Sequence, residues 1–196
     1  MKGKLFVFVF VFVFVAALAL AVSAVALGAH RSRIYGTNGA DVLTGTPGND
    51  LIVARAGNDS VSALAGNDRV FAGAGDDTVD AGPGNDFVRG GAGADSIQGG
   101  DGNDMLRGRH GDDTIDGGAG NDLIFAGSGA DHVLGGDGDD NIHILAADNQ
   151  VDTVDCGPGN DVIWVNSSQK NDVWTNCETV KIVTITTAQA NADDNG

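Results

Sequence analysis

Single aliphatic residues recur at every ninth position through the middle of the chain, separated by segments rich in Gly, Asp and Asn. Each has one variable residue on either side. Because a strand residue that points inward leaves both neighbours pointing outward, each triplet predicts a short β-strand. Gly, Asp and Asn favour turns, so the intervening segments are predicted as turns. The aliphatic positions are Leu43, Ile52, Val61, Val70, Val79, Val88, Ile97, Leu106, Ile115, Ile124, Val133 and Ile142.

These triplets belong to an uninterrupted repeat of nine residues, with twelve copies over residues 36–143. Three consecutive copies are GGAGADSIQ (90–98), GGDGNDMLR (99–107) and GRHGDDTID (108–116). The fourth position is always glycine: Gly39, Gly48, Gly57, Gly66, Gly75, Gly84, Gly93, Gly102, Gly111, Gly120, Gly129 and Gly138. The sixth position is always aspartate: Asp41, Asp50, Asp59, Asp68, Asp77, Asp86, Asp95, Asp104, Asp113, Asp122, Asp131 and Asp140.

The pattern G-G-x-G-x-D-x-U-x, with U aliphatic, resembles the RTX (hemolysin-type) calcium-binding repeat. This resemblance covers residues 36–143. It implies an all-β fold, a parallel β-roll that is a right-handed β-solenoid with two nonapeptides per coil. Alternate repeats then build opposite faces of the roll, and calcium is the expected cofactor.

The residue types suit that chemistry. Glycine permits positive φ and tight turns that aim carbonyl oxygens inward. Ca²⁺ takes six to eight oxygen ligands, which the sixth-position aspartates and carbonyls near the fourth-position glycines would supply. A turn and its equivalent 18 residues later, such as those of Asp41 and Asp59, would share one ion. Two stacks of six turns have five gaps each, so we expect several ions and at most about ten.

Charge points the same way. The formal net charge is −16, and residues 30–196 carry 9 Lys and Arg against 27 acids, a net charge of −18. The basic clusters that nucleic acid requires are absent from the sequence. Ten Ca²⁺ ions would nearly cancel the charge. Without calcium, we expect a self-repelling chain that behaves as a disordered Gly/Asp-rich linker.

The N-terminal 29 residues contain no acid and begin with two lysines before a long apolar run. We interpret residues 1–29 as a signal peptide, with an uncleaved anchor helix as the alternative. Either reading places the remainder outside the cytoplasm, and the protein would contact a membrane only if the segment is uncleaved. Residues 30–35 form a short lead-in to the repeats.

The C-terminal part is predicted as a cap. Residues 144–187 hold two degenerate repeats and resemble a cysteine-containing module that follows such repeats in secreted bacterial proteins. An even cysteine count in an exported chain favours a Cys156–Cys177 disulfide over free thiols or a metal pair. Asp152 and Asp161 are weaker metal candidates, because no intact neighbouring turn is assured. Residues 188–196 are expected to be a flexible tail.

One outer face of the roll is predicted to bind a partner. The face built by the even-numbered repeats gathers every Phe outside the leader together with Arg. Arg and aromatic residues are enriched in binding hot spots. A dimer, another protein or a glycan or lipid would cover this face, or it packs against the chain's own flanks. Its residues are Leu51, Val53, Arg69, Phe71, Phe87, Arg89, Met105, Arg107, Leu123 and Phe125.

Neither H-E-x-x-H nor G-x-S-x-G occurs in the sequence, so we expect no enzyme. The sequence therefore predicts a secreted, calcium-binding, non-catalytic structural or adhesion module. The alternative is a calcium-dependent substrate-binding accessory to a separate secreted enzyme.

Overall fold

The computed structural model describes residues 31–169 and 171–184. Over these residues the chain is all β, with seventeen strands and no helix. None of this described part forms an apolar helix of membrane-spanning length. The predicted signal peptide (1–29) and the predicted tail (188–196) lie outside the described residues.

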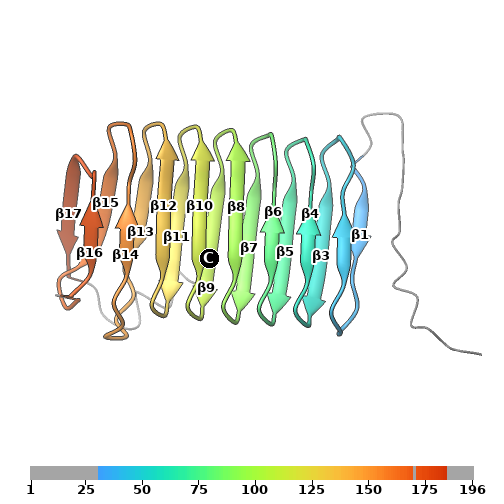
Figure 1. Ribbon diagram of the computed structural model, residues 1–196, viewed down its shortest axis with the longest axis horizontal. Coiled ribbons are helices and arrows are strands. Elements are labelled where there is room, and N and C mark those ends of the chain that lie inside the picture. The colour runs from blue at the N-terminus through green and yellow to red at the C-terminus, as the bar shows by residue number, and fades with distance from the viewer. Residues whose placement is uncertain (1–30, 170, 185–196) are drawn as a thin grey trace, which may run out of the picture.

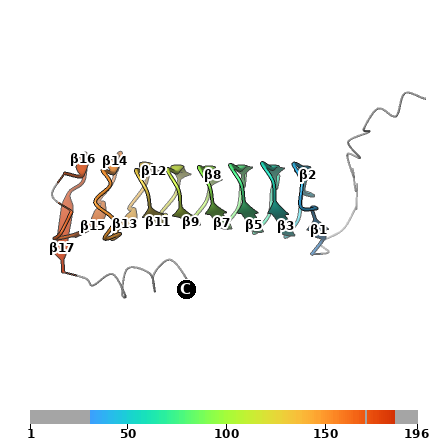
Figure 2. The ribbon, with the colours of Figure 1, turned by 90° about the horizontal axis from the view of Figure 1, so that it is seen from below.

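The strands form two parallel sheets that face each other along the whole roll (Figures 1 and 2). Successive strands alternate between the sheets, so each pair of nonapeptides makes one coil, as the resemblance to RTX repeats implies. Sheet A contains β1 (Arg33–Tyr35), β3 (Leu51–Ala56), β5 (Arg69–Ala74), β7 (Phe87–Ala92), β9 (Met105–His110), β11 (Leu123–Ser128), β13 (Asn141–Ile144), β15 (Val162–Asn166) and β17 (Thr179–Val183). Sheet B contains β2 (Val42–Thr44), β4 (Ser60–Ser62), β6 (Thr78–Asp80), β8 (Ser96–Asp101), β10 (Thr114–Ala119), β12 (His132–Asp137), β14 (Thr153–Asp155) and β16 (Val173–Thr175).

Many strands are longer than the predicted triplet. In β3, β5 and β7 to β12 the strand continues through the first three positions of the following repeat. Gly73 shows why small residues prevail there: its φ is 123°, and a Cβ would collide with the carbonyl oxygen of Arg55 on the preceding coil. Close approach of one coil to the next therefore favours glycine at this position.

Parallel pairing sets each residue beside its equivalent 18 positions later. Ile52 pairs with Val70 and Val88 pairs with Leu106. The buried side chains of the eighth position thus stack in two inward rows, with small first-position residues such as Ala54 and Ala126 packed beside them. Burial of each aliphatic side chain contributes about 1.5–3 kcal/mol. Because each repeat buries only one such side chain together with a small neighbour, the hydrophobic core of the roll is thin.

The C-terminal segment continues the same architecture. Three additional residues, 144–146, follow the last strict repeat, the first of them at the end of β13 and the others in the turn after it, so the pairing offset becomes 21 between Ile142 and Ile163. Strands β14 to β17 lengthen both sheets, and the predicted disulfide between Cys156 and Cys177 is present. Neither β1 nor β14 to β17 folds over the outer face of sheet A, because each is paired within one of the two sheets, with β1 and β17 as the edge strands of sheet A and β16 as an edge strand of sheet B.

Candidate metal centre

The sixth-position aspartates stack into two buried columns, one beside each sheet. Asp59 Oδ1 accepts a hydrogen bond from the Asp41 N–H at 2.8 Å, and Asp122 Oδ1 accepts one from the Asp104 N–H at 2.8 Å. Asp50 and the ten aspartates from Asp59 to Asp140 are at most 3% exposed, while Asp41 is partly exposed. Each turn therefore presents its carboxylate to the turn of the preceding coil, and the expected pairing of Asp41 with Asp59 is seen in the structure.

The second oxygen of most of these carboxylates faces the interior without a donor. Within the described residues, eleven buried Oδ2 atoms accept no hydrogen bond. A buried, unsatisfied charged oxygen is costly, so a set this regular indicates that these turns bind the same kind of ligand. These oxygens belong to Asp59, Asp68, Asp77, Asp86, Asp95, Asp104, Asp113, Asp122, Asp140, Asp161 and Asp172.

Backbone oxygens converge on the same spaces. A Cβ placed on Gly99 would lie 2.5 Å from Asp104 Oδ2 and 2.5 Å from the Gly117 carbonyl oxygen of the next coil. Real Cβ atoms essentially never come so close to other heavy atoms, so the glycine leaves a small cradle lined with oxygen. Carboxylate and carbonyl oxygens from two coils thus meet in one gap, which is the donor type that Ca²⁺ prefers.

The electrostatics of the columns favour a cation. Burial raises the pKa of Asp113 from 3.8 to about 8, with repulsion from Asp131, Asp95 and Asp112 adding to the rise. Burial likewise raises the pKa of Asp86 to about 7. In both cases the backbone N–H bonded to the carboxylate opposes the rise. A cation between the turns would replace the lost hydration and screen the repulsion within each column.

The donor set selects among metals. In the part of the chain that the structure describes, no cluster of three or more His, Cys, Asp or Glu side chains is placed to hold a metal ion. Any ion in the columns must therefore rely on backbone carbonyls as well as carboxylates. Such an all-oxygen set suits Ca²⁺, whereas structural Zn²⁺ sites use Cys and His.

The first turn of each column is built differently. Thr46 donates to Asp50 Oδ2 from its N–H at 2.5 Å and from its hydroxyl at 3.1 Å. Thr37 donates to Asp41 Oδ2 in the same way, at 2.6 Å and 3.0 Å. The repeat pattern alone makes all twelve aspartates equivalent and does not predict these two threonine contacts. Their signal is that threonine occupies the second position of the first two repeats only.

A second ladder, also missed from the sequence, follows the fifth position on the exposed side of the turns. Asn67 N–H donates to Asn49 Oδ1 at 3.0 Å, and Asn85 N–H donates to Asn67 Oδ1 at 3.1 Å. These side chains accept from the following coil, whereas the sixth-position aspartates accept from the preceding coil. The frequent Asn or Asp at this position was the available signal.

The columns extend beyond the twelve repeats. Asp152 Oδ1 accepts from the Asp131 N–H at 2.9 Å, and Asp161 Oδ1 accepts from the Asp140 N–H at 2.8 Å. Asp172 and Glu178 follow Asp152 and Asp161 as the last members. Each column therefore has eight members rather than six. Asp172 and Glu178 were not predicted, because their spacings from the preceding members are 20 and 17 residues.

The predicted partner residues line the outer face of sheet A. The ninth position forms a single file: Tyr35, Val53, Phe71, Arg89, Arg107, Phe125, His143, Trp164 and Lys181. The seventh position forms a parallel file: Arg33, Leu51, Arg69, Phe87, Met105, Leu123, Asn141, Val162 and Thr179. Neither file contains an acid.

Aromatic and cationic side chains stack along these files. The Arg107 guanidinium lies 4.7 Å from the centroid of the Phe125 ring, and the Lys181 ammonium lies 4.2 Å from that of Trp164. Phe71 and Phe87 contact each other with ring centroids 5.7 Å apart. Partial burial, then repulsion from Arg109 and Arg107, lowers the pKa of Arg89. The outer face of sheet A is thus a basic, aromatic strip on an acidic protein.

Stacked parallel coils with buried, oxygen-lined gaps define a calcium-binding β-solenoid. A family model described as the RTX calcium-binding nonapeptide repeat (4 copies) matches residues 35–70, 56–88, 80–110, 89–124 and 108–142. These matches together span residues 35–142, which is more than half of the chain, and the chain belongs to this family. No curated protein matches the chain. RTX repeats together with a disulfide are typical of extracellular proteins.

Proposed function

We propose that this protein is a secreted, non-catalytic module that folds when Ca²⁺ fills the gaps between stacked turns. The eleven buried Oδ2 atoms without a hydrogen bond carry the proposal. Without a cation, burial of so many carboxylates opposes folding, and the small core does little to offset it. With calcium, ligand binding and folding become one event.

The sixth-position aspartates from Asp59 to Asp140 are the proposed side-chain ligands, and first-position carbonyls such as that of Gly117 are proposed backbone ligands. Asp41 and Asp50 differ, because threonine donors already satisfy their Oδ2 atoms. Bound calcium would supply positive charge and oxygen coordination in each gap. The chain's own turns would hold the ligands in place through the hydrogen bonds between coils.

Circular dichroism of residues 30–196 tests this proposal. We expect mostly coil in chelator and a β signal in millimolar Ca²⁺. Mg²⁺ serves as the control, since its smaller size and octahedral preference suit these gaps poorly. A chain that is equally folded in chelator and in calcium would contradict the proposal.

The biological role that we propose is structural or adhesive, with the outer face of sheet A as the contact surface. Its aromatic and cationic files support this role, because such residues dominate binding hot spots. Phe71→Ser with Phe87→Ser should reduce association with a partner, whether a second copy, another protein or a glycan. Ser60→Ala with Thr78→Ala on the outer face of sheet B is the matched control. Lost thermal stability with unchanged association would contradict the role of this face.

The same files also favour a second candidate role, a calcium-dependent substrate-binding accessory to a separate secreted enzyme. Retention on purified cell walls or glycans would support adhesion. Stimulation of a separate glycan- or protein-degrading enzyme, lost in the double Phe variant, would support the accessory role instead.

A further inference from the structure

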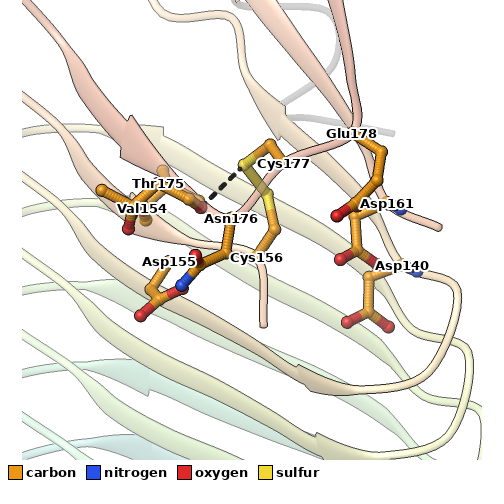
Figure 3. The surroundings of a disulfide bond; sticks show 9 residues. All are labelled: Asp140, Val154, Asp155, Cys156, Asp161, Thr175, Asn176, Cys177 and Glu178. Atoms are coloured by element: carbon orange, nitrogen blue, oxygen red, sulfur yellow. Dashed lines mark hydrogen bonds between the residues drawn. A yellow bond between two sulfur atoms is a disulfide. The ribbon is translucent and has the colours of Figure 1, made fainter. Parts of the chain in front are cut away.

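The two columns of stacked aspartates continue beyond the strict repeats. On the sheet A side, Asp140 is the last aspartate of the twelve repeats, and Asp161 and Glu178 lie beyond it in the cap (Figure 3). Asp161 Oδ1 accepts from the Asp140 N–H at 2.8 Å, the same bond that joins Asp104 and Asp122 inside the array. The carboxylate of Asp161 therefore lies against the turn of Asp140.

The gap between these two coils has the same oxygen lining as an interior gap. A Cβ on Gly135 would lie 2.7 Å from Asp140 Oδ2 and would collide with the carbonyl oxygen of Cys156. At the interior gap, the equivalent atoms are Asp104 Oδ2 and the Gly117 carbonyl oxygen around Gly99. Cys156 thus presents its backbone oxygen where a first-position residue of a strict repeat presents its own.

Burial and hydrogen bonding distinguish the carboxylates of Asp140 and Asp161 from their neighbours in the chain. Asp161 is fully buried, and Asp140 is 2% exposed. Within the described residues, the Oδ2 atoms of both accept no hydrogen bond. By contrast, their neighbours Asp139 and Asn160 are exposed and bond to each other, with Asn160 Nδ2 donating to Asp139 Oδ1 at 3.1 Å.

We propose that the cap holds a calcium ion between the coils of Asp140 and Asp161, with the carbonyl oxygen of Cys156 as a backbone ligand. This site rests on the proposed calcium-dependent folding and lies partly outside residues 35–142, which the family model matches. Cys156 also forms the disulfide with Cys177, so the ion and the disulfide would share one residue. The cap is then fastened to the array twice, by a covalent bond through the Cys156 side chain and by an ion through its backbone.

Native mass spectrometry of residues 30–196 with the disulfide intact tests the site, because it counts bound ions one by one. Asp161→Asn keeps the Oδ1 acceptor for the Asp140 N–H but removes the charge and the second oxygen. We expect this variant to bind one ion fewer than the unmodified chain. Asp122→Asn in the strict array should also lose one ion, whereas the exposed Asp139→Asn control should lose none.

An unchanged ion count in Asp161→Asn, alongside a loss in Asp122→Asn, would overturn the cap site and leave the proposed function intact. Binding of no calcium by the unmodified chain would overturn both proposals. Hydrogen exchange on the unmodified chain gives a second measurement if Asp161→Asn does not fold. The amides of Asp140 and Val162 should gain protection together with the interior turns as calcium is added. Exchange rates at these two amides that do not change with calcium would overturn the site.

Discussion

The interior turns of the roll and the turns at its ends share one sequence pattern but satisfy their carboxylates differently. In the interior, Asp104 Oδ2 accepts no hydrogen bond from the described residues and faces a cradle of oxygen. At the N-terminal end, Asp50 Oδ2 accepts from the amide and hydroxyl of Thr46. The comparison shows that the sixth-position aspartate fixes where a carboxylate lies, while the second-position residue decides whether it meets a donor.

The C-terminal end closes in another way. Exposed Glu178 takes the place of an aspartate and accepts from the Asp161 N–H at 2.9 Å, beside the disulfide of Cys156. The Oδ2 atom of Asp50 thus has donors that need no metal and the C-terminal end has a disulfide, whereas under the proposed function the interior Oδ2 atoms depend on calcium. This difference leads to four predictions.

The largest effect should come from pH in the absence of calcium. Burial raises the pKa of Asp95 to about 7 and that of Asp113 to about 8, so the folded interior binds protons more tightly than the unfolded chain. A raised carboxyl pKa means that the stability of the calcium-free roll is greatest below about pH 4 and falls as pH rises through 7 and 8. Circular dichroism in chelator should show more β structure at about pH 5 than at about pH 9.

In saturating calcium the sign should reverse, because protons compete with Ca²⁺ for the same carboxylates. Thermal unfolding measured over the same pH range, with and without calcium, checks both directions. Parallel pH profiles in the two buffers would show that the interior carboxylates are not the calcium ligands.

Reduction of the disulfide should have the next largest effect, and only at the C-terminal end. The bond spans 21 residues, and closing a loop of this length contributes about 3 kcal/mol in the chain-entropy model. Hydrogen exchange in calcium should show faster exchange in β15 to β17 after reduction, with β7 to β10 unchanged. Equal loss of protection in both regions would mean that the disulfide stabilises the whole roll and not its C-terminal end alone.

A pair of Asp→Asn variants tests the comparison directly. Asp104→Asn should bind one calcium ion fewer and unfold in calcium at a temperature lower by roughly 2–8 °C. Asp50→Asn should keep the full ion count, because Thr46 already occupies its Oδ2. Loss of an ion in Asp50→Asn would show that the threonine-closed turn binds calcium after all.

The smallest effect is expected for Thr46→Ala. This change removes the hydroxyl donor to buried Asp50 and should lower the free energy of unfolding in calcium by about 1 kcal/mol. Thr78→Ala on the exposed outer face of sheet B is the control, with an expected change within about 0.5 kcal/mol. Calorimetric melting compares the two, and equal effects would argue against a special role for Thr46.

Much of the fold could be predicted from sequence because the repeat is strict. An aliphatic residue at every ninth position, as at Ile97 and Leu106, predicted the strands and their inward residues, and the resemblance to RTX repeats implied the alternation between two sheets; the structure confirms both. Parallel stacking at an offset of 18 then predicted that Asp41 lies beside Asp59, and the hydrogen bond between them confirms it.

The remaining features were missed where the period changes or where a residue acts outside its repeat position. Asp172 and Glu178 continue the columns, but their spacings of 20 and 17 residues from the preceding members depart from the 18-residue spacing that identified the others. Thr37 and Thr46 occupy a position that the repeat leaves variable in this chain, so their restriction to the first two repeats marks them as unusual, while their hydrogen bonds show what they do. The fifth-position ladder depends on the direction of side-chain acceptors, which the periodicity does not encode.

The offset of 18 residues is uniform between the coils of the strict repeats, so the length of the roll depends on the number of repeats. Each additional 18 residues adds one strand to each sheet and advances the molecule by about 4.8 Å, the spacing of neighbouring strands. Because every interior coil contacts only its two neighbours, a block such as residues 90–107 can be duplicated or deleted without altering the threonine-closed start or the disulfide-linked end. The distance between the two ends of the roll can thus change in fixed steps of one coil, while the residues at each end stay the same.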